Sequence, residues 1–190
     1  MKSALRILLI LLSPTLLFAS QADKPSEPPS DTEIKLALAE AKHAFEQYKT
    51  VIAHGEQLLG KDVFQQDRML LDHWETTSKA VTQNPQSFDS ELGFDLLMDL
   101  DDAARNTALC ADQSSTLVLN DINNLHSQKS QLLLELHQSC MDSSKSLFAA
   151  SENTNVLFLR YVKWQKQAAA QAAEAAARCA DALKKAGNQP

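Results

Sequence analysis

The chain has 190 residues and contains 24 acidic residues against 18 Lys and Arg, which gives a formal net charge of −6 at pH 7. A net negative chain lacks the clustered basic residues that neutralise phosphates, so we expect no nucleic-acid binding. The length suits one folded domain. With four glycines in the whole chain, the turn and alternation signals typical of strands and hairpins are absent.

Residues 1–22 are typical of an export signal. A positive start with Lys2 and Arg6 precedes an apolar run at 7–18 and small residues at 19–22, where a peptidase could cut. The apolar run is shorter than the about 20 residues that span a bilayer, although an uncleaved anchor is the alternative. We therefore expect a periplasmic or secreted protein with no stable membrane insertion after cleavage.

The next stretch, residues 23–30, is rich in proline and polar residues and predicts a linker. Asp31 is positioned to cap a first helix, whose apolar stripe continues to Gly60. A second helix is predicted over about 61–82, and it ends before Pro85 because the residue preceding a proline is pushed out of the helical region.

Residues 94–186 contain neither glycine nor proline, and their near-heptad apolar stripe indicates long helices. Polar stretches interrupt the stripe at 111–116, 120–124 and 150–155, which makes these stretches candidate turns. The sequence therefore predicts an all-α fold over residues 31–187. We expect an antiparallel helical bundle of about five helices, some long, with coiled-coil-like packing and short connections.

Cysteines in exported proteins usually pair, and this chain has three of them. A hairpin that turns near Leu125 would place Cys110 and Cys140 at equal distances from the turn and level with each other. We therefore predict a Cys110–Cys140 disulfide, provided that the side chains meet the geometry that the bond requires. This pairing favours the turn at 120–124 and argues against the turn at 111–116.

The third cysteine, Cys179, lies in an alanine-rich segment, residues 165–187. Alanine has the highest helix propensity but buries only a methyl group, so this helix offers close approach more than a core. We expect it to form a homodimer that an intermolecular Cys179 disulfide could seal. The alternative is that Cys179 is a small buried residue of an ordinary last helix.

Three soft potential ligands, His137, Cys140 and Met141, share one helical turn. Such side chains suit Cu(I), and a histidine with a methionine can hold a haem iron. A metal or haem carrier that uses His137, Met141 and a histidine from another helix is the alternative function. A disulfide at Cys140 argues against it, so we expect no cofactor.

Two charged segments are candidate partner-binding surfaces. The acidic ridge consists of Glu91, Asp95, Asp99 and Asp102, which recur at spacings of four, four and three. The aromatic-basic segment consists of Arg160, Tyr161, Lys163 and Trp164. Like charges one turn apart repel, so the ridge needs a positive partner, an internal pairing with the aromatic-basic segment, or plain solvation.

Catalytic motifs with a recognisable mechanism are missing from the sequence: it has no Gly-rich phosphate loop, no Gly-x-Ser-x-Gly elbow and no His-Glu-x-x-His. We expect the protein not to be an enzyme. The sequence favours an exported helical-bundle interaction protein that binds a protein partner, as a chaperone-like factor or an envelope or secretion accessory.

Overall fold

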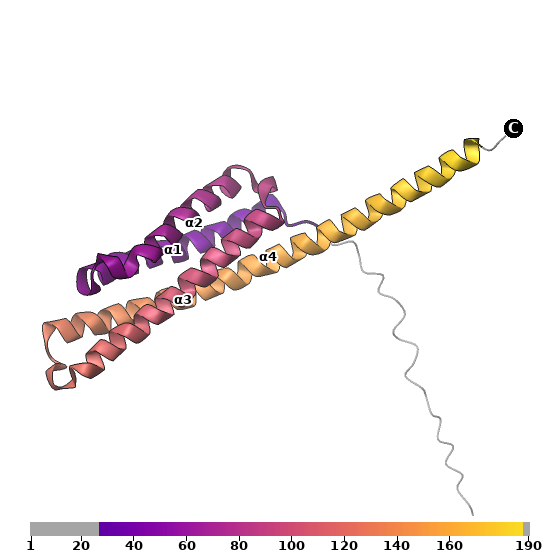
Figure 1. Ribbon diagram of the computed structural model, residues 1–190. Helices are drawn as coiled ribbons and strands as arrows, with labels where there is room; N and C mark the ends of the chain where they lie inside the picture. Colours follow the sequence, from indigo (N-terminus) through magenta and orange to yellow (C-terminus); the bar gives the residue numbers. More distant parts are fainter. Residues whose placement is uncertain (1–26, 188–190) are drawn as a thin grey trace, which may run out of the picture.

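The computed structural model describes residues 27–187, so the predicted signal at 1–22 and the first half of the linker, residues 23–26, lie outside the described residues. The described part is all-α and has no strand, which confirms the predicted fold class. Its helices are α1 (Asp31–Leu59), α2 (Gln65–Gln83), α3 (Ser90–Asn120) and α4 (Gln128–Gly187). Short 3₁₀ turns, η1 (Lys61–Phe64), η2 (Pro85–Ser87) and η3 (Ile122–Asn124), join them (Figure 1).

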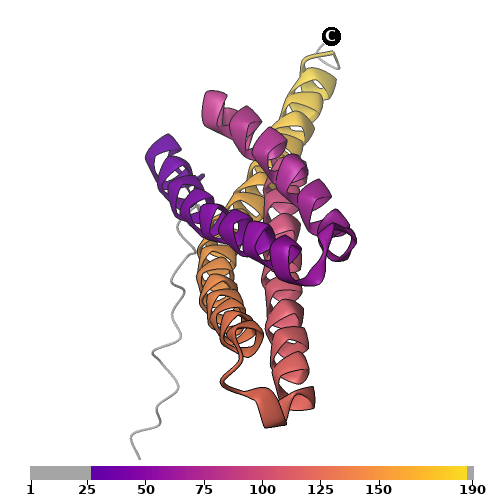
Figure 2. The same cartoon turned by 90° about the vertical axis from the view of Figure 1, so that its left-hand side faces the viewer.

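The bundle consists of two helical hairpins. α3 and α4 form a long antiparallel pair, and the shorter pair of α1 and α2 lies obliquely across one face of it (Figure 2). α1 packs mainly against α4, and α2 packs against α3. The core therefore lies between the two hairpins and along the interface between α3 and α4.

The number of helices differs from the expected five, because the described part has four α-helices and two of the candidate turns do not exist. Residues 111–116 lie inside α3, and residues 150–155 lie inside α4. The hydroxyl of Ser114 donates to the carbonyl oxygens of Cys110 (2.7 Å) and Ala111 (3.1 Å). This hydroxyl is satisfied within its own helix, so residues 111–116 do not end α3. In the stretch 150–155, the Ser151 hydroxyl donates to the Asp101 carboxylate of α3 (3.0 Å), which bonds this part of α4 to α3.

The third candidate turn, at 120–124, is where the chain reverses. α3 ends at Asn120, η3 follows, and the hydroxyl of Ser127 accepts a hydrogen bond from the backbone N–H of Ser130 at the start of α4 (3.1 Å). The connection is short, so α3 and α4 are antiparallel neighbours, as the sequence predicted.

The N-cap of α1 is Ser30, one residue before the predicted Asp31. The Ser30 hydroxyl accepts from the backbone N–H of Glu33 (3.3 Å), and the Glu33 carboxylate accepts from the backbone N–H of Ser30 (2.8 Å). This reciprocal capping box satisfies two N–H groups that would otherwise lack a partner within the helix.

The end of α1 and the bounds of α2 agree with the sequence prediction. α1 ends before Gly60, whose φ of 98° suits glycine because it has no Cβ. The helical segment that follows runs through η1 into α2 and ends at Gln83, before Pro85.

The large side chains of the core come from both hairpins. Phe45 of α1 stacks face to face on Trp74 of α2, with ring centroids 4.2 Å apart and an interplanar angle of 4°. Between α3 and α4, the fully buried leucines are Leu96, Leu100, Leu136 and Leu147. Their burial contributes hydrophobic stabilisation to the hairpin of α3 and α4.

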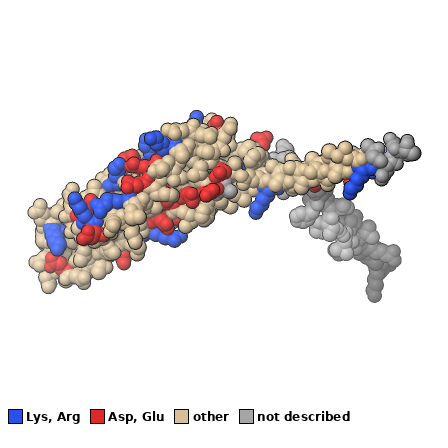
Figure 3. Space-filling model, turned by 45° about the horizontal axis from the view of Figure 1, so that its top comes forward, with Lys and Arg blue, Asp and Glu red and all other residues tan. Residues whose placement is uncertain are grey.

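The last part of α4 runs beyond the other three helices (Figure 1). All residues from 169 to 185 are exposed, and we call residues 169–187 the projecting helix. At 1.5 Å per residue it is roughly 28 Å long. Its visible face carries few charged residues except near its end (Figure 3). None of the described helices has the length and apolarity that crossing a membrane requires.

Candidate functional site

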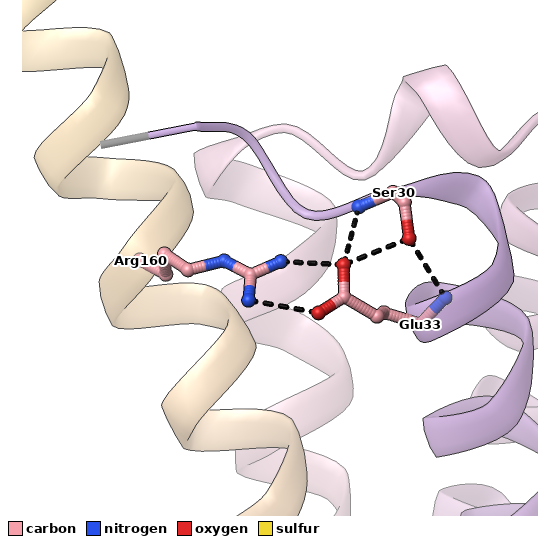
Figure 4. Close-up of polar contacts among 3 residues, drawn as sticks. All are labelled: Ser30, Glu33 and Arg160. Atoms are coloured by element: carbon pink, nitrogen blue, oxygen red, sulfur yellow. Dashed lines mark hydrogen bonds and ion pairs between the residues drawn. The ribbon is translucent and has the colours of Figure 1, made fainter. Parts of the chain in front are cut away.

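Arg160, a residue of the predicted aromatic-basic segment, is bound to the start of α1. Its guanidinium donates two hydrogen bonds to Glu33, with Nη1–Oε1 at 2.8 Å and Nη2–Oε2 at 2.6 Å (Figure 4). Glu33 also belongs to the capping box of α1. The pair therefore joins the first turn of α1 to α4, and Arg160 pairs with Glu33 rather than with the acidic ridge.

This arrangement lowers the pKa of Glu33 from 4.5 to about 2, first through the hydrogen bonds from Arg160 and then through those from Ser30. A carboxylate with a depressed pKa stabilises the fold above its unfolded pKa, and this contribution is lost as the pH falls through the folded value.

We expect Glu33→Gln to reduce stability at pH 7, and the difference from the parent to shrink as the pH falls from about 5 to about 2. Urea unfolding at several pH values measures this, with the exposed Glu46→Gln on the same helix as a control. Added salt should also reduce the difference, because the pair is partly exposed. A difference that is constant over this pH range would contradict the assignment.

The aromatic members of the segment lie next to Phe88, which precedes α3, and next to each other. The ring of Tyr161 lies 6.0 Å from that of Phe88 and 5.6 Å from that of Trp164. Beside them, Phe94 lies 6.1 Å from Phe158, and Phe94 remains about half exposed. Tyr161 and Trp164 are half-buried, so this end of the bundle presents a partly covered aromatic surface.

The acidic ridge is not one continuous surface. Glu91 is exposed, and Asp95 and Asp102 are partly exposed, but Asp99 is buried against α2. The carboxylate oxygens of Asp99 lie 2.9 and 3.0 Å from Nδ1 of His73. The structure therefore leaves three of the four residues at the surface and places the fourth between two helices.

Burial raises the pKa of Asp99, while the hydrogen bond from His73 opposes this effect. A lysine at this position would bring a charged, longer side chain against α2. Charge reversal that probes the surface of the ridge should therefore use Glu91, Asp95 and Asp102, and should leave Asp99 in place.

Cys110 of α3 and Cys140 of α4 lie side by side as free thiols, as their equal distances from the turn suggested. The Cys140 thiol donates a hydrogen bond to Cys110, which lowers the pKa of Cys110 and raises that of Cys140. Both residues are buried. The disulfide between them stays a prediction.

Three further polar residues, Tyr48, Asp67 and Asn106, lie next to this pair, and no sequence motif indicates them. The Tyr48 hydroxyl of α1 donates to the buried Asp67 carboxylate of α2 and also interacts with Asn106 of α3. Burial is the main cause that raises the pKa of Tyr48, followed by Asp67. The charge of Asp67 in turn raises the pKa of both cysteines.

These residues form what we call the four-helix polar cluster, to which every α-helix contributes: Tyr48, Asp67, Asn106, Cys110 and Cys140. A hollow of about 190 Å³ lies beside the cluster, and Asp67, Asn106 and Cys110 are among the residues that line it. Cys140 is not part of that lining and is fully buried. The two sulfurs therefore differ in their access to the outside.

His137 and Met141 are the residues of the alternative carrier hypothesis, which stays a hypothesis. His137 Nδ1 lies 2.8 Å from the carbonyl oxygen of Ala111 and is therefore the N–H donor of that hydrogen bond. Met141 is partly exposed while Cys140 is fully buried. Within residues 27–187, no group of three or more His, Cys, Asp or Glu side chains is placed to hold a metal ion.

Cys179 is exposed on the projecting helix. The alternative that it is a small buried residue of a packed last helix is therefore wrong within the single chain. The reason is that α4 continues past the other helices, so no element of the described chain covers this thiol.

Comparison with known proteins gave no relative: no family model, no curated protein and no solved structure matches the chain.

Proposed function

We propose that this chain is an exported helical-bundle protein that acts by binding a protein partner, and that the projecting helix is its main binding element. The observation that carries the proposal is the exposure of every residue from 169 to 185 in a helix that the bundle holds at its other end. The positive start, the apolar run and the small residues within 1–22 support export. The mass of the chain recovered outside the cytoplasm would show whether this segment has been cleaved off.

The pattern of small residues from Ala168 into the projecting helix supports another α-helix as the partner. Ala168, Ala172, Ala175, Cys179 and Ala182 recur at alternating spacings of four and three. This spacing places them on one stripe, as at the a and d positions of a coiled coil. Because their side chains are small, a second helix can approach this stripe closely.

A second copy of the chain is the partner that we favour. In a parallel pair each heptad position faces the same position of the other helix, so the two Cys179 thiols would lie at the same level. The thiol is exposed and can be oxidised without any movement of the bundle. An intermolecular disulfide would then seal a dimer that the alanine stripe forms.

A matched pair of substitutions tests the dimer. We expect Ala175→Glu, which places a charge on the stripe, to shift the chain from dimer to monomer in light scattering. Ala177→Glu on the opposite face should leave the dimer intact, because both alanines are exposed in the single chain. Neither change should alter the stability of the bundle, because neither side chain contacts it.

A non-reducing gel tests the Cys179 disulfide separately. On a non-reducing gel the parent should give a covalent dimer, and the same chain with Cys179→Ser should not. A parent chain that is monomeric at high concentration, or equal effects of Ala175→Glu and Ala177→Glu, would overturn the dimer. In that case a different protein would have to occupy the projecting helix.

The exposed part of the acidic ridge and the aromatic surface around Trp164 form a second element of the proposal. Both belong to the body of the bundle rather than to the projecting helix. A partner captured through them would depend on Glu91, Asp95 and Asp102 and would be released by salt, whereas the alanine stripe would be little affected by salt. An envelope or secretion accessory that binds client proteins would use such surfaces.

A further inference from the structure

We propose that Cys110 and Cys140 form a reversible redox pair, in which Cys110 exchanges with low-mass thiols and disulfides that enter the hollow beside it. Cys140 then closes or reopens the intramolecular disulfide. This inference concerns the body of the bundle and is independent of the projecting helix.

The positions of the two cysteines favour Cys110 as the residue that exchanges. Cys110 and Cys140 lie on the two helices of an antiparallel hairpin, and the Cys140 thiol donates a hydrogen bond to the Cys110 sulfur. Cys110 is 5% exposed and lines the hollow, whereas Cys140 is 0% exposed and does not. An incoming molecule therefore meets Cys110 first.

The two thiols also differ in acidity. The hydrogen bond from Cys140 favours the thiolate of Cys110 and disfavours that of Cys140. Because the thiolate is the nucleophile in exchange, the accessible sulfur is also the more reactive of the two. The buried charge of Asp67 raises the pKa of both thiols and moderates this reactivity. The hydroxyl of Tyr48, which donates to Asp67, holds that carboxylate in place.

A small disulfide R–S–S–R oxidises the cysteine pair in two exchange steps. The Cys110 thiolate attacks one sulfur, the S–S bond breaks, and one RS⁻ leaves with a mixed disulfide on Cys110. Cys140 loses its proton and attacks the Cys110 sulfur, which releases the second RS⁻. The two thiolates that leave take up the two protons that the cysteines lost. Two protein thiols are oxidised to one disulfide, and R–S–S–R is reduced to two thiols.

The pair differs from a closed structural disulfide in one measurable respect. A disulfide sealed in the core would form and break only when the hairpin opens, and then both sulfurs would react at similar rates. Entry through the hollow instead predicts that the two cysteines react at different rates in the folded protein.

The test uses the full chain with Cys179→Ser, so that the exposed thiol does not contribute. Two further variants carry Cys140→Ser or Cys110→Ser, and circular dichroism confirms that both are folded. Each folded protein is incubated with oxidised glutathione, and intact mass with peptide mapping follows the adduct. We expect Cys110 in the Cys140→Ser variant to acquire one glutathione at least about tenfold faster than Cys140 in the Cys110→Ser variant.

The chain that retains both cysteines provides the second measurement. It should lose two hydrogens without keeping an adduct, and reduced glutathione should return it to the dithiol under native conditions. Equal rates for the two single-cysteine variants, or a disulfide that glutathione reduces only in denaturant, would overturn the proposal. The latter result would leave a purely structural disulfide.

Discussion

Trp74→Ala is expected to lower the free energy of unfolding by about 3–5 kcal/mol, the range measured when a large buried aromatic is truncated. Trp74 is 2% exposed and stacks on Phe45, so the substitution removes both the buried area and the aromatic pair. The buried residues of α2 are Asp67, Trp74, Thr77 and Val81, and Trp74 is by far the largest of them. Its loss should therefore weaken the attachment of α2 more than that of any other helix.

Urea denaturation followed by far-ultraviolet circular dichroism measures this effect. Met69→Ala on the same helix is the control, because Met69 is 66% exposed and its truncation should change stability by less than about 0.5 kcal/mol. Hydrogen exchange adds a local test, in which the amides of α2 should lose protection before those of α3 and α4. A loss under 1 kcal/mol for Trp74→Ala would show that α2 is not held by this stack.

Gly55→Leu is expected to cost at least about 3 kcal/mol, although glycine inside a helix is by itself unfavourable. Replacing a helical glycine by a residue such as Leu or Ala gains up to about 1 kcal/mol in helix propensity. At Gly55, however, a Cβ atom would lie 2.2 Å from the Cζ of Phe64. Phe64 is buried, so its ring would have to leave its site, and the cost of that exceeds the propensity gain.

The same substitution in a chain that also carries Phe64→Ala tests whether the contact with Phe64 causes the loss. With Phe64→Ala, the space over Gly55 is empty, and Gly55→Leu should then be neutral or stabilising because the leucine fills it. The sign of the effect should thus reverse between the two backgrounds when both are measured by urea unfolding. The same loss in both backgrounds would mean that the glycine is needed for a reason other than its contact with Phe64.

Parts of the candidate site could be found in the sequence because they depend on distances along one or two helices. Cys110 and Cys140 are equally far from Leu125, which lies in the connection between α3 and α4, and an antiparallel hairpin that turns there places them level with each other. The predicted N-cap of α1, Asp31, is wrong, although the sequence contains the pattern of the true cap: Ser30 followed three residues later by Glu33 is a capping box. Asp31 is an equally good cap by residue type alone, and only the hydrogen bonds distinguish the two.

Other parts could not be found because their members come from different helices. Tyr48, Asp67, Asn106 and the cysteine pair are far apart in the sequence, and none belongs to a motif. The spacing of Asp99 predicts a place in the acidic ridge, but α2 packs against α3 so that Asp99 contacts His73. Arg160 likewise pairs with Glu33, 127 residues away in the sequence, and not with the acidic ridge.

The sequence by itself determined that the chain is helical, where α1 and α2 end, and that the last helix is rich in alanine. These properties follow from local backbone preferences, from the glycine and proline positions and from the period of the apolar residues. The tertiary structure decided that polar stretches inside α3 and α4 stay helical, because the long packed interface between these helices outweighs the weak preference of Ser, Thr and Asn for turns. It also decided which acidic side chains face solvent and that four helices meet at one buried polar cluster, since both depend on how the two hairpins cross.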